Sequence, residues 1–265
     1  MTIPYRAFGL MYHDVVEGAE SAGFRHSAAT AYQVDLGEFH AQLVAIGKGP
    51  AQPVTVFEAA RAQKPEYLLL TFDDGGRSAL CAAEELEKHG WKGHFFITTG
   101  LIGTTGFLSE DDIRELHRRG HILGSHSHTH PNICYNLPKV EMLDEWQRSC
   151  EILAKILDEP VLTASVPGGD MNGETVATAA EAGIKFLFTS EPTFKPWQQS
   201  GITCFGRVCV KHDTSLAAVE RLIRFQGFGR QMAIRRCKQL VKKLIGPIYR
   251  RRMPRSYSAA PDGGP

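Results

Sequence analysis

The sequence predicts an α/β protein whose parallel sheet, wrapped by helices, closes into a (β/α) barrel. Two observations lead to this fold class. Short apolar segments alternate with helical patterns along most of the chain, and there are seven such segments. An open sheet is the alternative, but this number of strands favours a barrel. In barrels of this kind the functional side chains gather at the carboxyl ends of the strands.

Each predicted strand is a short run of mainly apolar residues. In chain order the runs are AFGLMYH (7–13), YLLLTF (67–72), HFFIT (94–98), HILGSH (121–126), VLTASV (161–166), IKFLFT (184–189) and FGRVCV (205–210). Most of them are separated by a segment with helical character, which is the pattern expected of a parallel sheet.

Four helices are predicted between these strands from their start and stop signals. They span residues 77–89, 109–119, 139–157 and 173–182. Ser109 and Asp112 have the spacing of a capping box at the start of the second helix. Gly90, Gly120 and Gly183 follow three of the helices, where a left-handed residue ends the helical turn.

The bulk composition indicates one large domain with a substantial core, since 43% of the 265 residues are apolar. The chain contains no run of about 18 apolar residues, so no membrane-spanning helix is expected. The first residues lack the basic-then-apolar order of a secretory signal, so a cytoplasmic location is expected. Six scattered cysteines without a CxxC pair indicate buried thiols in a reducing compartment.

Charge divides the chain into a barrel domain, 1–226, and a C-terminal extension, 227–265. Residues 1–220 hold 18 Lys and Arg against 28 Asp and Glu, whereas residues 221–265 hold 12 against one. A helix is predicted over 231–245, with an apolar stripe of Ile234, Cys237, Leu240, Val241, Leu244 and Ile245. The opposite side is basic and carries Arg235, Arg236, Lys238, Lys242 and Lys243.

This extension predicts peripheral contact with an anionic membrane through residues 231–255, because basic side chains beside an apolar stripe suit such a surface. The alternative is an ordinary outer helix that packs on the barrel. Nucleic acid is not expected as a partner, since its binding would use the same charges without needing the apolar stripe.

Two acidic residues, Asp73 and Asp74, directly follow the predicted strand at 67–72 and precede Gly75 and Gly76. A polar turn is the alternative, since Asp-Gly is a common turn pair. A turn does not need two carboxylates beside a buried strand, where burial and repulsion oppose the ionisation of both. A bound cation would remove that cost, so the pair favours a functional site.

Histidines crowd the end of the predicted strand at 121–126, where HILGSHSHTHPN contains four of the chain's eleven. His126 and His130 are four residues apart, so a helical turn or an extended segment places both rings on one side. On its own this spacing favours surface histidines. Combined with the acidic pair, it supplies one carboxylate and two imidazoles, a set that binds catalytic divalent ions.

TFDDG (71–75) followed about fifty residues later by HSxxH (126–130) resembles the polysaccharide deacetylase family, the NodB-homology domain of carbohydrate esterase family four. GHILGSHSHTHPNI resembles the family's second motif, SVPGGDMN its third, and MYHDV the opening strand of many bacterial members. The resemblance extends from about Leu10 to Leu222. It implies a distorted (β/α) barrel of about seven strands.

The resemblance also implies hydrolysis of an acetyl group, usually the N-acetyl group of a hexosamine. Carried over by position, Asp74, His126 and His130 hold a divalent ion, most often zinc, and Asp73 is the general base. A bound metal lowers the pKa of water from 15.7 toward about 7–9 and polarises the carbonyl group.

The third motif departs from the family pattern. The family commonly has Arg-x-Pro-x-Gly, in which the arginine orients the base, and here Ser165 stands in the place of that arginine. Pro167 and Gly168 are expected to bind substrate, and the Gly168 amide can hold the developing oxyanion. The serine bears on how the base is held more than on the family assignment.

Three further residues have candidate roles. VCVKHDT (208–214) loosely resembles the family's last motif, which makes His212 the candidate general acid; an exposed loop histidine is the alternative. His13, with its neighbour Asp14, could line the same rim or form a structural hydrogen bond. Trp197 in EPTFKPWQQS is a candidate for stacking on a sugar ring, with core or rim packing as the alternative.

Three functions are compatible with these residues. The first is a metal-dependent deacetylase acting on an N-acetylated carbohydrate precursor of a polysaccharide or glycolipid. The second is an amidase or deformylase acting on a sugar-nucleotide or another small amide. The third is a non-catalytic glycan-binding descendant, and the presence of Asp73, Asp74, His126 and His130 together argues against it.

Overall fold

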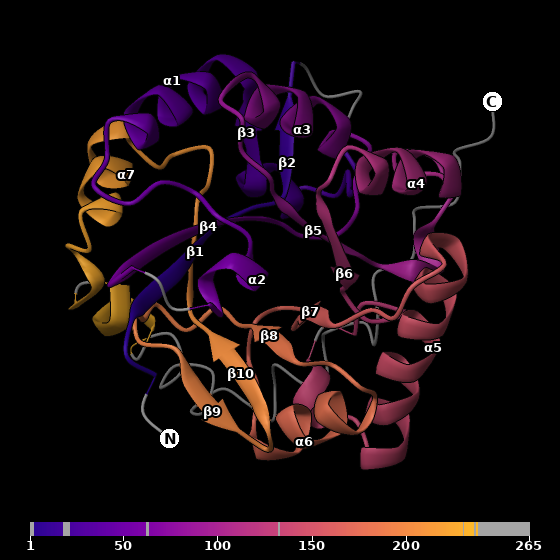
Figure 1. Ribbon diagram of the computed structural model, residues 1–265. Helices are drawn as coiled ribbons and strands as arrows, with labels where there is room; N and C mark the ends of the chain where they lie inside the picture. Colours follow the sequence, from indigo (N-terminus) through magenta and orange to yellow (C-terminus); the bar gives the residue numbers. More distant parts are fainter. Residues whose placement is uncertain are drawn as a thin grey trace.

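Parallel strands form a barrel at the centre of the computed structural model, and helices surround it (Figure 1). The structure describes residues 3–17, 22–61, 64–131, 133–229, 231–235 and 237. The strands of the main sheet are β1 (Arg6–Tyr12), β4 (Glu66–Phe72), β5 (His94–Ile97), β6 (Ile122–Ser125), β7 (Thr163–Ser165), β8 (Phe186–Phe188), β9 (Trp197–Gln199), β10 (Ile202–Phe205) and β11 (Arg207–Cys209). Their order is β11-β1-β4-β5-β6-β7-β8-β10-β9.

The barrel closes through one strand that bends at Gly206. Before this glycine, β10 pairs in parallel with β8, and after it, β11 pairs in parallel with β1. A Cβ at Gly206 would lie 2.4 Å from Thr193 O and 2.5 Å from Glu191 O, so only glycine fits the bend. Since β10 and β11 together form one side of the ring, the ring has seven strands, which confirms the predicted barrel.

The helices are α1 (Leu36–Gly47), α2 (Val56–Ala59), α3 (Ala79–Lys88), α4 (Glu110–Arg118), α5 (Lys139–Leu157), α6 (Gly173–Glu181) and α7 (Leu216–Ile223). Four of them, α3 to α6, match the predicted helices to within two residues at each end. The capping box at the start of α4 is present: Ser109 Oγ accepts from Asp112 N (3.2 Å), and Asp112 Oδ2 accepts from Ser109 N (2.9 Å).

Some elements have no counterpart in the sequence prediction. The short strands β2 (Asp14–Val16) and β3 (Gln33–Asp35) form a separate two-stranded ladder, and β9 pairs antiparallel with β10. Three residues are too few to give a period-two pattern. Helix α1, capped by Asp35, buries Phe39, Leu43 and Ile46 at helical spacing and contacts α7, which was also not predicted.

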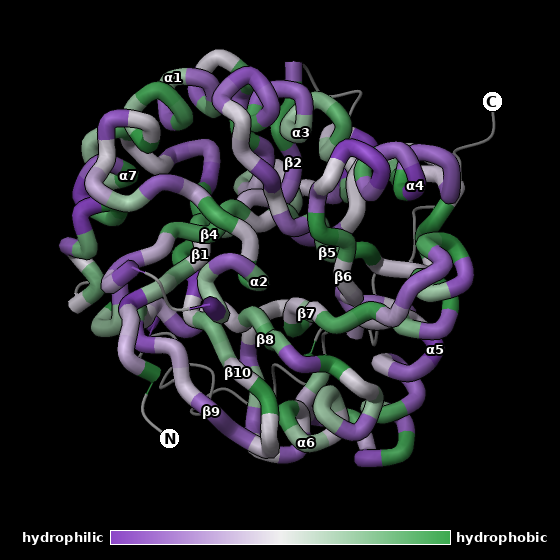
Figure 2. Tube along the Cα trace, in the orientation of Figure 1, coloured by the Kyte–Doolittle hydropathy of each residue, from purple (hydrophilic) through white to green (hydrophobic). Residues whose placement is uncertain are grey.

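Apolar residues fill the barrel itself as well as the space between strands and helices. Leu69, Phe96, Phe188 and Phe205 belong to the inner cluster, and α2 adds Val56 and Ala59 to it. A larger cluster joins the strands to the surrounding helices. Figure 2 shows hydrophobic residues along the central strands and hydrophilic residues over much of α4. All six cysteines are free thiols, as predicted, but only Cys134, Cys150 and Cys204 are buried, and Cys237 is exposed.

The barrel core extends slightly beyond the boundary expected at residue 226. The Phe228 ring packs edge-to-face on Phe8 of β1, with ring centroids 4.8 Å apart. Arg235 forms ion pairs with Asp170 (3.1 Å) and Glu191 (2.9 Å), so it contacts the barrel and does not lie on an outer basic side as the helical wheel predicted. Most of the predicted helix over 231–245, and the basic run up to residue 255, lie outside the described residues.

No helix within the described part of the chain has both the length and the apolar character to cross a bilayer.

His94 links two layers of the barrel as a buried, neutral histidine. Its Nε2 accepts a hydrogen bond from Val56 N at the start of α2 (2.9 Å), and its Nδ1 donates to Leu70 O (2.9 Å). This pattern requires the proton on Nδ1 alone, because Nε2 must remain an acceptor. Burial lowers the pKa of His94 to about 4 from its ordinary value of 6.5.

We expect this histidine to make the fold sensitive to acid. The unfolded chain binds the proton more readily, so the stabilisation is complete above pH 6.5 and decreases as the pH falls toward 4, by about 3 kcal/mol in total. Denaturant unfolding of wild type and His94→Gln at pH 7.5, 6, 5 and 4 measures it. The difference in unfolding free energy between wild type and His94→Gln should shrink with falling pH. A constant difference for His94→Gln would contradict the prediction.

Candidate active site

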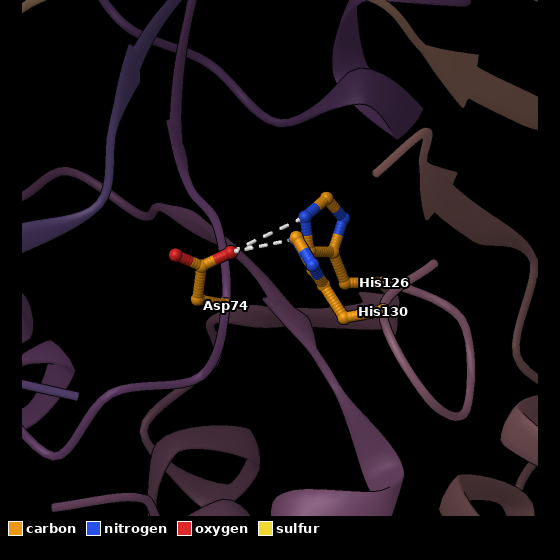
Figure 3. A group of neighbouring side chains, drawn as sticks. All are labelled: Asp74, His126 and His130. Atoms are coloured by element: carbon orange, nitrogen blue, oxygen red, sulfur yellow. Dashed lines mark ion pairs between the residues drawn. The ribbon is translucent and has the colours of Figure 1, made fainter. Parts of the chain in front are cut away.

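Asp74, His126 and His130 form one cluster at the carboxyl ends of β4 and β6 (Figure 3). Nε2 of His126 and Nε2 of His130 each lie 3.4 Å from Asp74 Oδ1. The ligand atoms of the three residues all lie within 4.8 Å of one another, the one such group among the described residues. Asp74 and the two histidines are about fifty positions apart in the sequence. The parallel barrel brings the ends of β4 and β6, which carry them, to the same edge.

The backbone around the cluster adopts conformations that non-glycine residues rarely use. Asp74 (φ 76°), Ser127 (φ 64°) and His130 (φ 54°) all lie in the left-handed region. Each such residue costs free energy, and such residues persist where the surrounding structure holds them. Here they turn the Asp74 carboxylate and the His130 ring toward the same point.

Glu145 of α5 holds the histidine loop in this shape. Its Oε2 accepts hydrogen bonds from His128 N (2.9 Å) and Thr129 N (2.8 Å), and its Oε1 accepts one from Thr129 Oγ1 (2.6 Å). Ser127 Oγ accepts a further bond from His130 N (3.1 Å). The loop between the two cluster histidines is therefore fixed by side chains, and sequence reasoning had not identified Glu145.

The proton position on His126 follows from its backbone partner. Nδ1 of His126 lies 3.0 Å from Ser165 O, which can only accept, so Nδ1 carries the proton. Nε2 is then the ring nitrogen that faces Asp74 and would bind an ion. This arrangement, with the second ring nitrogen bonded to a carbonyl oxygen, is typical of metal-binding histidines.

The three residues fit a divalent metal ion in donor type and in spacing. Metal–ligand distances of about 2.0–2.1 Å in a tetrahedron place neighbouring donors about 3.3 Å apart, and both nitrogen–oxygen separations are 3.4 Å. Burial alone would raise the pKa of Asp74, but the two histidines outweigh it and hold this pKa well below its ordinary value. The carboxylate is thus ionised, as a metal ligand must be.

Asp73 lies beside the cluster in a different environment. Arg207 of β11 binds both of its oxygens, Nη1 to Oδ1 (2.7 Å) and Nη2 to Oδ2 (2.8 Å), and Ser165 Oγ donates to Oδ2 (3.1 Å). The Asp73 Oδ2 atom also lies 3.9 Å from His126 Nε2. Burial would raise the pKa of Asp73, but Arg207 and His126 lower it below the ordinary value.

Sequence reasoning missed Arg207, although a signal was present. This arginine is the one charged residue in the predicted strand FGRVCV (205–210). Charged residues are almost never fully buried unless they are paired, and the Arg207 side chain is fully buried. A charge within an apolar strand therefore indicated a buried partner.

The first strand also contributes a residue to this site. His13 Nδ1 is buried without a hydrogen-bond partner in the described structure, and the ring packs against Tyr32 with centroids 4.6 Å apart. Burial lowers the pKa of His13, while the nearby charges of Asp74 and Asp73 partly oppose that effect. His13 is therefore a mainly neutral imidazole close to both carboxylates.

Asp14, next to His13, has a structural role. Both of its carboxylate oxygens accept from Gly23 N (3.1 Å each), and Oδ1 also accepts from Ser78 Oγ (2.6 Å). Burial raises its pKa to about 6. Asp14 thereby fixes the loop that carries Phe24, whose ring lies 5.5 Å from that of His130.

The other predicted site residues lie in different places. Pro167 is buried and Gly168 exposed in the loop after β7, two and three residues beyond Ser165. His212 is exposed in a turn after β11, where its N–H donates to Ala31 O (3.2 Å), and no described contact joins its ring to the cluster. Trp197 on β9 packs against the hydrophobic core, and its Nε1 donates to Gln199 Oε1 (3.3 Å).

The parallel barrel with a carboxylate–imidazole cluster at its strand ends defines a barrel protein with a candidate catalytic metal centre. Residues 60–187 match the family model of polysaccharide deacetylases. The first two sequence motifs and the cluster itself lie in that span, so this part of the chain is similar to the polysaccharide deacetylase family.

A curated relative is similar in sequence, and two solved structures are similar in fold. YxkH of Bacillus subtilis, described as a polysaccharide deacetylase, is 26% identical over 190 residues, which cover 69% of this chain and 64% of YxkH. The fold is similar to that of the Streptococcus pyogenes deacetylase PplD (TM-score 0.67, 21% identity, 82% of this chain and 97% of that one). It is also similar to IcaB from Ammonifex degensii (TM-score 0.68, 21% identity, 83% and 97%).

We expect the purified protein to bind about one divalent ion per chain through Asp74, His126 and His130. Elemental analysis after dialysis should show that His126→Ala and His130→Ala each lose most of this metal. His117→Ala, which changes a histidine paired with Glu159 on the surface, should keep it. Equal metal content in wild type and His130→Ala would remove His130 from the site.

Proposed function

We propose that the protein is a metal-dependent hydrolase that removes the acetyl group from an N-acetylated carbohydrate. The observation that carries the proposal is the cluster of Asp74, His126 and His130 with an arginine-bound carboxylate, Asp73, beside it. One carboxylate is available to hold the ion and the other to take a proton. The similarity of residues 60–187 to polysaccharide deacetylases supports a carbohydrate substrate.

Zinc is the ion we propose, because two imidazole nitrogens and one carboxylate oxygen form a donor set typical of catalytic zinc sites. When bound, such an ion supplies a water of lowered pKa and polarises the acetyl carbonyl. Asp73 is proposed as the group that accepts the proton of the attacking water. Its Oδ2, which is the oxygen nearer to His126, is placed toward the cluster.

Two further groups complete the proposed reaction. The Gly168 N–H, in the loop that follows Ser165, is proposed to donate a hydrogen bond to the developing oxyanion, with Pro167 shaping the same substrate contact. His13 is the proposed proton donor to the leaving amine: it would take up the proton that Asp73 accepts from water, and the nearby Asp74 and Asp73 favour its charged form. The exposed position of His212 favours it less for that role.

The proposed substrate is an N-acetylhexosamine in a precursor of a polysaccharide or glycolipid, deacetylated in the cytoplasm. The solved Streptococcus pyogenes deacetylase was in complex with acetate, the product expected here. Release of acetate should be measured with N-acetylhexosamine oligomers, glycolipids and sugar-nucleotides, with and without a chelator. Formate release, or activity on nucleotides alone, would favour the amidase or deformylase function, and no release with metal-loaded protein would favour glycan binding.

Asp73→Asn should keep the metal and lose most of its turnover, because an amide cannot accept the proton of water. Loss of a general base costs on the order of a hundredfold or more in rate. Asp74→Asn should instead lose the metal. Acetate release and metal content measured on both variants test the division of roles. Metal loss in Asp73→Asn with retention in Asp74→Asn would reverse it.

His13→Gln and His212→Gln separate the two candidates for the proton donor. If His13 protonates the leaving amine, its replacement should lower turnover by about a hundredfold, with little change in metal content, and His212→Gln should remain close to wild type. Rate measurements over the pH range in which histidine titrates would decide between them. The opposite pattern would return the role to His212.

We also propose peripheral attachment to the cytoplasmic membrane face through residues 231–255, where a lipid-linked sugar would be presented. The support is the charge of the segment, about 1 kcal/mol per basic residue near an anionic surface. The full chain should float with anionic but not with neutral liposomes. A version ending at residue 237, which keeps Phe228 and Arg235, should not float. Equal flotation of both versions would contradict the attachment.

A further inference from the structure

Arg207 lies on a strand outside the part of the chain that matches the polysaccharide deacetylase model. The match ends at residue 187, whereas β11, which closes the barrel against β1, spans 207–209. Ser165 occupies the third-motif position that is commonly arginine in the family. In the structure its hydroxyl is bonded to the guanidinium of Arg207 (2.6 Å).

All five N–H donors of Arg207 have partners inside the barrel. Nε donates to Thr189 O (3.1 Å), and Nη1 donates to Thr71 Oγ1 (3.2 Å) and Asp73 Oδ1. Nη2 donates to Asp73 Oδ2 and Ser165 Oγ. A guanidinium group has five donors in a rigid fork. Complete bonding to residues of β4 and β7, and to the residues that directly follow β4 and β8, leaves it a single orientation.

Gly9 provides the space through which this side chain passes. It faces Arg207 across the β1–β11 ladder, and a Cβ at Gly9 would lie 2.8 Å from Arg207 Cγ and 3.1 Å from Cδ. These are atoms in the middle of a fully buried side chain, so they cannot swing away as the end of a surface side chain would. Any larger residue at position 9 would displace the guanidinium.

We propose that Arg207 is the positioning residue for Asp73. Gly9 of β1 leaves the space for its side chain, and Ser165 of β7 bonds to its guanidinium. The fork fixes the Asp73 carboxylate in its plane, so that Oδ2 stays turned toward the His126 side of the cluster. Ser165 links Arg207 and Asp73 by accepting from one and donating to the other. The catalytic part of this proposal rests on the proposed function.

Two mild variants test it in the metal-loaded full chain. Gly9→Ala keeps every charge and should shift the guanidinium, while Arg207→Lys keeps the charge without the fork. We expect both to lower kcat by roughly tenfold to a hundredfold, with KM and metal content close to wild type. Arg119→Lys is the matched control, because Arg119 makes a two-pronged pair with Glu87 away from the site.

Moving the arginine from position 207 to position 165 tests, through protein stability, whether both positions serve the Asp73 carboxylate. The side chain at position 165 already reaches Asp73 Oδ2, 3.1 Å away. Ser165→Arg alone should lower the unfolding midpoint, because Arg207 fills the neighbouring space. Arg207→Ser alone should also lower it, because Asp73 loses its partner. The double variant should be more stable than the sum of the two losses predicts, with part of the kcat restored.

The outcomes are distinguishable. Wild-type kcat in both Gly9→Ala and Arg207→Lys, or additive destabilisation in the double variant, would overturn the role of Arg207. A metal-loaded wild type and an Arg119→Lys protein that are both inactive on every carbohydrate would overturn the proposed function instead. In that case the relocation experiment still decides whether Arg207 and position 165 serve the same carboxylate.

Discussion

The buried ion pair between Arg207 and Asp73 joins the barrel's closure to its candidate site. The Arg207 guanidinium lies inside the barrel, 5.8 Å from the centre of the Phe96 ring. A charge in such a place is costly unless it is paired and fully hydrogen-bonded, and both conditions are met here. The pair spans from β4 to β11, so the strand that closes the ring also carries the charge that compensates Asp73.

The barrel interior is layered along its axis. Aromatic and aliphatic side chains, together with the neutral His94, fill the end toward α2. Gly9 of β1 lies opposite Arg207 of β11 on one side and Leu69 of β4 on the other, and Asp73 follows four residues beyond Leu69. Polar chemistry therefore begins where the apolar filling ends. This order gives a candidate metal centre a rigid apolar base.

Asp73 and Asp74 show how environment separates two identical neighbours. Asp73 continues the strand direction and meets an arginine, whereas the left-handed backbone of Asp74 turns its carboxylate toward two imidazoles. One acid is thus held by a permanent cation of the protein and the other is free to hold an exchangeable one. The proposed division into base and metal ligand follows from this difference, and Glu145 makes it durable by fixing the histidine loop.

The sequence by itself determined the strand–helix alternation, six barrel strands with the β11 part of the seventh, and the helices α3 to α6, because apolar periodicity and capping residues such as Ser109 act locally. It also identified Asp74, His126 and His130 as a set, since strand ends are recognisable and parallel strands share an edge. Only the tertiary structure decided what holds Asp73. The partners of Arg207 lie up to 136 positions away in the chain, and no local pattern encodes a contact made across a closed barrel. The bend at Gly206, the space at Gly9 and the exposed position of His212 were decided in the same way, because each depends on which strands the closed ring makes neighbours.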